Sequence, residues 1–379
     1  MSQHVRTVVS LLSLSPAAAR TFLRHPQLQH DNVIPKVMFL LSDVGLSKER
    51  VREMVLRHPK MFNSVMLDDL VPTVEYLKGE VGMTDVELKR MIKKHPRVVR
   101  YNRVTIKRNI SFFRTSVLGG LGTKKERTRN LKRIYLQAPR LLGYDPKGLG
   151  VKVEYFKDMG LRDEELRELF VSCPSILTYS TENNIEATRE WLELQGLGED
   201  KVCRCLVKYP NLFTLSVTQN LDPKVEWMEG RIGLERERGH VARVVSMFPP
   251  IMWLSKNNLD SKLTYLQETF GWDDDELRGV ILGMPQILGL GLEGNIKETV
   301  EYYLSQGCSK GQLGEAIMDS PSLLAYSLEG RIKPRVEEME GRGIKVRYAP
   351  LYVVGMPEKG WRKWIDGQGG TWSVSGVGV

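Results

Sequence analysis

The stretch Pro174-Ser-Ile-Leu-Thr-Tyr179 is one copy of a pattern that returns along the whole chain. A proline, one further residue and two apolar residues also form Pro139-Arg-Leu-Leu, Pro210-Asn-Leu-Phe, Pro285-Gln-Ile-Leu and Pro321-Ser-Leu-Leu. Nine related prolines lie 33 to 43 residues apart, at Pro26, Pro59, Pro96, Pro139, Pro174, Pro210, Pro249, Pro285 and Pro321. Such a period is typical of stacked supersecondary repeats, so we expect an elongated array with an extended binding surface.

The repeat that begins at Pro174 shows how one copy is built. After the short turn, residues 182–195 carry apolar side chains at helical spacing. Gly196-Leu197 ends this helix, because a glycine adopts the left-handed conformation at little cost. A second helix is predicted from about Glu199 to Tyr209, where Pro210 stops it.

The other repeats use the same signals. Glycine followed by an apolar residue recurs at Gly45, Gly82, Gly160, Gly233, Gly271 and Gly307. Thr84 with Glu87, Asp273 with Glu276, and Ser309 with Gln312 have the spacing of capping boxes. The acids Asp273, Asp274 and Asp275 therefore indicate a helix start, and a metal site there is the weaker interpretation. The fold class predicted is all-α, a solenoid of about nine repeats.

Composition excludes several classes of protein. The chain has 379 residues, of which 41% are hydrophobic and 27% charged, and it has no apolar run long enough to span a membrane. The cysteines Cys173, Cys203, Cys205 and Cys308 lack zinc-site spacing, so we expect reduced, inert thiols. No catalytic triad or phosphate-binding loop is present, and we expect no enzyme activity, no metal and no cofactor.

Bulky pairs also keep a fixed register, 16 or 17 residues after the proline. They are Tyr76-Leu77, Phe112-Phe113, Tyr155-Phe156, Trp191-Leu192, Trp227-Met228, Tyr265-Leu266 and Tyr302-Tyr303. We interpret them as core between repeats, and a platform for base stacking as the alternative. His25, His58 and His95 precede repeat prolines where other repeats have Ala, Cys or Phe, which indicates a packing position.

The charge is distributed very unevenly. The net charge is +9, yet residues 88–152 contain 19 Lys and Arg against two acids, Glu126 and Asp145. This segment alone carries 19 − 2 = +17, so the rest of the chain carries 9 − 17 = −8. Residues 154–200 have 12 acids and four bases. A solvated face usually mixes signs, so the basic segment predicts a polyanionic partner, with neutralisation by the acidic neighbour as the alternative.

The candidate binding residues belong to two consecutive repeats. We expect Arg90, Lys93, Lys94 and Arg97 on one helical side, Arg100 and Arg103 in the turn, and Lys107 and Arg108 at the next helix start. Arg127, Arg129, Lys132, Arg133 and Arg140 occupy the corresponding places one repeat later. Because equivalent positions of a stack share a face, the two groups should form one basic stripe that binds nucleic acid.

The repeats resemble those of a known family. PSILTYSTENNIEATREWLELQGL (174–197), PQILGLGLEGNIKETVEYYLSQG (285–307) and PSLLAYSLEGRIKPRVEEMEGRGI (321–344) are similar to repeats of the mitochondrial transcription termination factor (mTERF) family. The likeness covers about residues 20–345, and Ser327 to Pro334 is especially like the last repeat of plant and algal members. It implies a superhelix of repeats with two helices and a 3₁₀ turn each.

The resemblance also implies a function. Members of the family act in mitochondria or chloroplasts, where they bind duplex DNA in a basic groove and affect transcription, while some act on RNA. We therefore expect a monomeric organellar protein that binds duplex DNA and regulates transcription, for example its termination. RNA binding in intron splicing or ribosome assembly, and a protein–protein scaffold, are the alternatives. No membrane partner is expected.

The chain departs from the family pattern in the length of one repeat and in its N-terminal segment. The repeat from Pro96 to Pro139 has extra residues at Gly119 to Lys125, which we expect to form a loop beside the stripe. The chain has no clear transit peptide, and residues 8–24 look like the end of a partial first repeat. We expect the array over residues 1–343, a C-terminal cap over 344–365 and a disordered tail over 366–379.

Overall fold

The computed structural model describes residues 3–28, 33–62, 67–120 and 122–367, in two compact units, Met1–Thr181 and Glu182–Val379. The described residues form helices and turns without a β-strand. The first unit contains α1 (Gln3–Leu11), α2 (Pro16–Leu23), α3 (Val33–Ser42), α4 (Lys48–Arg57), α5 (Leu67–Val81), α6 (Asp85–Lys94), α7 (Arg103–Phe112), α8 (Lys124–Gln137), α9 (Pro146–Asp158) and α10 (Asp163–Ser172). The second contains α11 (Ala187–Leu194), α12 (Glu199–Lys208), α13 (Asp222–Ile232), α14 (His240–Met247), α15 (Lys256–Phe270), α16 (Asp274–Gly283), α17 (Glu298–Ser305), α18 (Lys310–Asp319), α19 (Lys333–Gly341) and α20 (Glu358–Gly367).

Each repeat proline begins a short 3₁₀ helix, as the sequence predicts. These turns are η1 (Pro26–Leu28), η2 (Pro59–Phe62), η3 (Pro96–Arg100), η5 (Pro139–Gly143), η6 (Pro174–Thr178), η8 (Pro210–Thr214), η10 (Pro249–Met252), η11 (Pro285–Gly289) and η13 (Pro321–Leu324). In the turns that begin at Pro139, Pro174, Pro210, Pro285 and Pro321 the two apolar residues are buried, and Leu141 and Leu142 are fully so. Burying such side chains stabilises the fold by about 1.5–3 kcal/mol each.

The helix boundaries follow the predicted stop and start signals. The stop glycines have left-handed backbone angles, with φ of +70° at Gly82 and +72° at Gly271. Thr84 with Glu87, Asp273 with Glu276, and Ser309 with Gln312 form reciprocal capping boxes. These local signals fix where the helices begin and end.

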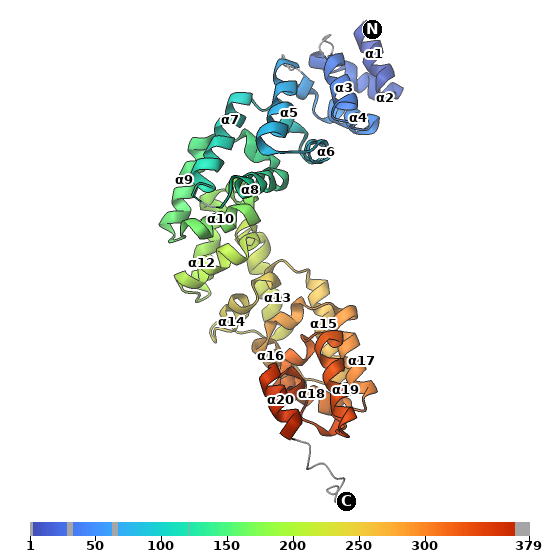
Figure 1. The fold of residues 1–379 in the computed structure, drawn as a ribbon, viewed down its shortest axis with the longest axis vertical. Helices are drawn as coiled ribbons and strands as arrows, with labels where there is room; N and C mark the ends of the chain where they lie inside the picture. The colour runs from blue at the N-terminus through green and yellow to red at the C-terminus, as the bar shows by residue number, and fades with distance from the viewer. Residues whose placement is uncertain (1–2, 29–32, 63–66, 121, 368–379) are drawn as a thin grey trace, which may run out of the picture. The chain divides into compact units, whose positions relative to one another are not determined.

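Within each unit, equivalent elements of successive repeats stack on one another (Figure 1). In the first unit α7 contacts α9, α8 contacts α10, and η3 contacts η5. In the second unit α14, α16 and α18 contact in series, as do η8, η10, η11 and η13. Each repeat therefore contacts its neighbours through its first helix, its second helix and its turn. These elements form three rows along the stack. The fold is an all-α repeat solenoid.

A polar side chain that is buried or half-buried occupies one position of each first helix that follows a repeat proline, a feature that we did not predict. It lies 10 to 14 residues after the repeat proline, and eight of the nine residues are fully buried while Lys152 is half-buried. The set is Lys36, Thr73, Asn109, Lys152, Thr188, Lys224, Lys262, Thr299 and Arg335.

The longer members of this set donate to backbone carbonyls in the turn of the next repeat. The Lys36 and Lys262 ammonium groups lie 2.6 Å from the oxygens of Phe62 and Leu288. The Asn109 amide donates to Tyr144 O at 3.0 Å. A buried carbonyl without a donor is costly, so these bonds join each first helix to the following turn. By contrast, the Thr73 and Thr188 hydroxyls have no partner among the described residues.

Two local predictions need correction. In the aromatic pairs the second residue is buried but the first is mostly half-buried, because Tyr76 and its equivalents lie at the edge of the first helices. The helix predicted over residues 182–195 begins with a π-helical turn, Thr181–Glu186. Before the first repeat proline, Pro26, the structure has two helices, α1 and α2.

At the C-terminal end, α20 continues two residues beyond the predicted cap. Asp366 belongs to the helix because Arg342 holds its carboxylate at 2.9 Å. Residues 368–379 of the predicted tail lie outside the described residues.

Candidate nucleic-acid interface

The predicted basic residues all lie in the first compact unit, on five elements. Arg90, Lys93 and Lys94 are on α6, Arg97 and Arg100 on η3, Arg103, Lys107 and Arg108 on α7, Arg129, Lys132 and Arg133 on α8, and Arg140 on η5. Two positions differ from the prediction, because Pro96 ends α6 before Arg97 and because Asn102 caps α7 so that Arg103 is its first residue.

Arg97 and Arg140 lie close together on adjacent turns. Each follows a repeat proline directly, η3 contacts η5, and both side chains are exposed. Burial and the positive charges of Arg140, Arg97 and His58 lower the pKa of His95. The His95 ring in turn lies 2.7 Å from the Tyr101 hydroxyl. We call this group of cations on the stacked turns the turn edge. Here the positive charges of two consecutive repeats lie side by side.

The C-terminal ends of the second helices add further cations. The Lys94 ammonium donates to Gln137 O, at the end of α8, with a distance of 3.0 Å. Arg50 donates to Lys93 O at the end of α6 in the same way. A cation next to exposed terminal carbonyls is favoured by the helix dipole. The carbonyls at the helix ends therefore help to accommodate this positive charge, and Arg50 also pairs with Glu53.

The first helix α7 carries its cations differently. The Lys107 ammonium lies over the Tyr76 ring, 5.5 Å from its centroid, whereas Arg108 is exposed. The Arg103 Nε is buried without a hydrogen-bond partner in the described part of the chain. α7 thus presents one cation held against an aromatic ring and one in solvent.

Two cations of the basic segment are compensated by carboxylates. Lys132 pairs with Glu87 at 3.0 Å and Arg114 with Glu80 at 2.7 Å. Among the described residues, no carboxylate lies within ion-pair distance of most of the other candidates. These are Arg90, Lys93, Lys94, Arg97, Arg103, Lys107, Arg108, Arg129, Arg133 and Arg140. Glu87 thus already offsets the charge of Lys132.

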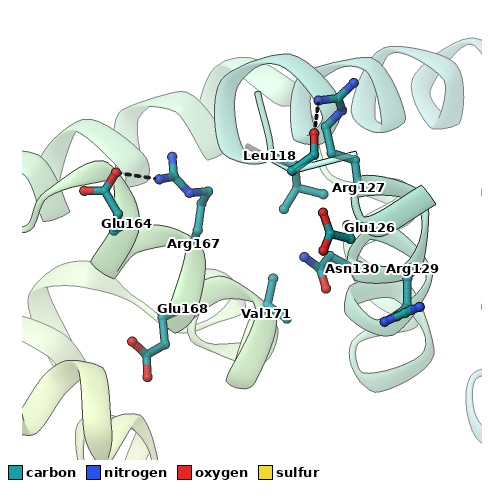
Figure 2. Close-up of a pocket in the computed structure, with 10 residues that line it drawn as sticks. Leu118, Glu126, Arg127, Arg129, Asn130, Glu164, Arg167, Glu168 and Val171 are labelled. Carbon is teal, nitrogen blue, oxygen red and sulfur yellow. Dashed lines mark hydrogen bonds and ion pairs between the residues drawn. The ribbon is translucent and has the colours of Figure 1, made fainter. Parts of the chain in front are cut away.

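The longest repeat forms a hollow between α8 and α10. Its volume is about 470 Å³, and Leu118 and Val171 supply apolar lining. Figure 2 shows Arg127, which donates to Gly122 O at 3.1 Å, and Arg167, which pairs with Glu164 at 2.9 Å.

Acids from both sides, Glu126 on α8 and Glu168 on α10, also line this hollow. The acidic neighbour therefore approaches the basic segment here, rather than at the turn edge. The hollow is lined by as many arginines (Arg127, Arg129, Arg167) as glutamates (Glu126, Glu164, Glu168), so it lacks the excess of positive charge found at the turn edge.

Other kinds of site find little support in the described residues. No three His, Cys, Asp or Glu side chains are grouped as metal ligands there. The four cysteines form no disulfide in the described part of the chain, and burial raises the pKa of Cys205 and Cys308, which makes their thiolates scarcer. In the same part of the chain, every helix is too short or too polar for a bilayer crossing.

A comparison with family models agrees with this architecture. The mTERF model matches residues 3–149, 114–231 and 195–356, three overlapping segments that span most of the chain. The chain belongs to the mTERF family. Proteins of the mTERF family bind nucleic acids in organelles, act in transcription-related regulation and are not known as enzymes. No curated protein matches this mTERF chain.

Proposed function

We propose that this mTERF protein binds duplex DNA through the basic segment of residues 88–152 and thereby regulates organellar transcription. The observation that carries the proposal is the turn edge, where Arg97 and Arg140 of consecutive repeats lie together without a nearby carboxylate. Lys93 and Lys94 extend this surface along the end of α6. Cations that neutralise phosphates release condensed counterions, which supplies affinity without sequence readout.

The proposed binding residues are those predicted from the sequence, but one of them is expected to contribute less to the affinity. Lys132 contributes less, because releasing it from Glu87 costs part of the gain. Lys107 and Arg108 contribute from α7. The array over residues 1–343 provides the surface, and the segment after Gly343 closes its end.

The salt dependence of binding tests this mechanism. If about eight phosphates are contacted, the slope of log affinity against log salt is near −7 on duplex DNA. Fluorescence anisotropy with a labelled 25-bp duplex between 50 and 300 mM KCl measures it. A slope near zero would refute electrostatic binding.

Competition distinguishes the polymers. Unlabelled duplex DNA, duplex RNA and single strands of one sequence are added to the labelled complex at fixed salt. We expect duplex DNA to compete best. If RNA competes at least tenfold better, the protein is an RNA-binding member. If the duplex binds a Lys93→Ala, Lys94→Ala, Arg97→Ala variant as tightly as the parent, the basic segment is not the site.

A further inference from the structure

The last repeat of the second compact unit has a first helix and a turn but lacks the second helix between them. Helix α19 ends before the left-handed Gly343, and Pro350 then begins a tenth turn, η16 (Leu351–Gly355). Val353 and Val354 are buried like the apolar pair of other turns, and η16 stacks on η13.

Arg335 confirms this equivalence, because it donates to Val354 O at 2.8 Å from the buried position used in other repeats. The stop glycine and the proline are 350 − 343 = 7 residues apart, against 321 − 307 = 14 in the preceding repeat. Only the short helix η15 (Val346–Tyr348) fits in that interval.

The missing helix leaves one face of α18 with a groove. Second helices elsewhere use this face to contact the next second helix, as α16 contacts α18. Here a groove of about 430 Å³ lies between α18 and the segment from Val346 to Tyr352. Tyr348 and Tyr352 line it, with 60% and 54% of their surface exposed.

On this face α18 differs from three second helices inside the array, whereas α10 also carries acids there, Glu165 and Glu168. Arg50, Arg243 and Lys94, which lie nine, six and two residues before their repeat prolines, donate to the terminal carbonyls of the next second helix.

At the same three positions α18 carries Gln312, Glu315 and Asp319, and all three line the groove. Glu315 and Asp319 are exposed and have no ion pair among the described residues. Arg347 lies at the groove with its guanidinium over Tyr348, so the carboxylates outnumber the cation two to one.

We propose that this groove binds a lysine- or arginine-bearing amphipathic helix of a partner protein, which takes the place of the missing second helix. A helix is the element that covers the same face in other repeats. Carboxylates on that face require cations from the partner, and exposed tyrosine rings accept both aliphatic and cationic side chains. This surface is distinct from the basic segment and goes beyond nucleic-acid binding.

A charge-swap experiment on the full chain tests the proposal. The probe is a fluorescein-labelled 15-residue helical peptide with a leucine stripe flanked by lysines, measured by anisotropy. We expect E315K/D319K to weaken binding at least tenfold. The matched control E298K/E301K adds the same +4 charge on α17 and should change the dissociation constant less than twofold. A peptide with Glu in place of Lys should bind E315K/D319K better than the parent chain.

The other outcomes would overturn the proposal. These are no binding of the lysine peptide, equal weakening in both variants, or no rescue by the glutamate peptide. A dimer of the parent chain in light scattering that E315K/D319K abolishes would assign the groove to a second copy. Circular dichroism verifies that the variants fold. A second variant, Tyr352→Ser, should weaken the peptide at least threefold but leave duplex affinity unchanged, so the test does not depend on the nucleic-acid site.

Discussion

Residues 88–152 and residues 217–367 each contain 19 Lys and Arg, but the two regions differ in how many carboxylates offset these positive charges. The first region has two acids and the second has 22. In the second region nine cations hold carboxylates within the described residues: Arg231, Arg236, Arg238, Arg278, Lys297, Lys333, Arg335, Arg342 and Arg362. In the first, Arg114 and Lys132 do so.

The comparison separates what the fold requires from what function requires. Both regions use the same turns, stop glycines and buried donors. The second region shows that these repeats form with balanced charge. The excess in residues 88–152 is therefore not needed for folding, and like charges without partners destabilise a compact state. A polyanionic ligand explains why it is there.

The largest difference between the regions should be in nucleic-acid affinity. We expect Lys93→Ala, Arg97→Ala, Arg140→Ala to weaken duplex binding about 100-fold near 0.1 M salt and to reduce the salt slope by about 3. The measurement is anisotropy with the labelled duplex.

The matched control removes three exposed cations of the second region, Lys256, Lys310 and Lys345. It should change affinity no more than about threefold. Equal losses in the two triple variants would mean that only net charge matters.

The buried donors should behave alike in both regions. Asn109→Leu and Lys262→Met each leave a turn carbonyl without its donor, at Tyr144 and Leu288. We expect each to lower the free energy of unfolding by about 2 kcal/mol in urea denaturation. Lys256→Met, an exposed position on the same helix as Lys262, serves as the control with little change. A loss confined to one region would show that the repeats are not built alike.

Replacing Arg231 and replacing Arg97 should change the free energy of unfolding in opposite directions. Arg231 reaches Asp260 at 2.5 Å and Gln267 at 3.0 Å, so Arg231→Met should destabilise the protein by about 1.5 kcal/mol. Arg97→Met relieves repulsion with Arg140 and should stabilise the free protein by about 0.3 kcal/mol. Urea unfolding without nucleic acid measures both. Destabilisation by Arg97→Met as large as that by Arg231→Met would contradict the contrast.

The pH dependence of the free energy of unfolding is the smallest expected effect, and it should be similar in the two regions. Burial lowers the pKa of Lys224 to about 8 and lowers that of Lys152. Between pH 8 and 10.5 the unfolded chain then binds more protons than the folded chain, so stability rises with pH. We expect Lys224 to contribute about 1 kcal/mol of the rise from pH 8 to 9.5, so urea unfolding at each pH should show a smaller rise in Lys224→Met, with the remainder coming from Lys36, Lys152 and Lys262, whose pKa values burial also lowers. The same slope in that variant would assign the effect to other groups.

The periodic prolines and stop glycines were sufficient to predict the fold, because each acts through local backbone geometry. The capping boxes of Thr84, Asp273 and Ser309 were predictable for the same reason. The buried donors were not, since Lys36, Thr73 and Asn109 share no residue type and their role depends on the next turn. A search for polar residues at one fixed register would have found them.

The candidate site could be predicted in outline only. The sequence identifies the excess charge, but the partner of each cation depends on which helices meet. Thus Lys132 faces Glu87, 45 residues earlier, while Arg97 and Arg140 lie beside each other. The missing second helix after Gly343 was overlooked, because Pro350 arrives seven residues after the glycine and so breaks the period.

Lysine footprinting tests the central claim most directly. The full chain is acetylated briefly with and without the labelled duplex, and modified peptides are quantified by mass spectrometry. We predict at least fivefold protection of Lys93, Lys94 and Lys107, with no protection of the exposed Lys256, Lys310 and Lys345. Equal reactivity of Lys93 and Lys94 in the free and bound protein, or protection confined to the C-terminal lysines, would contradict binding through residues 88–152.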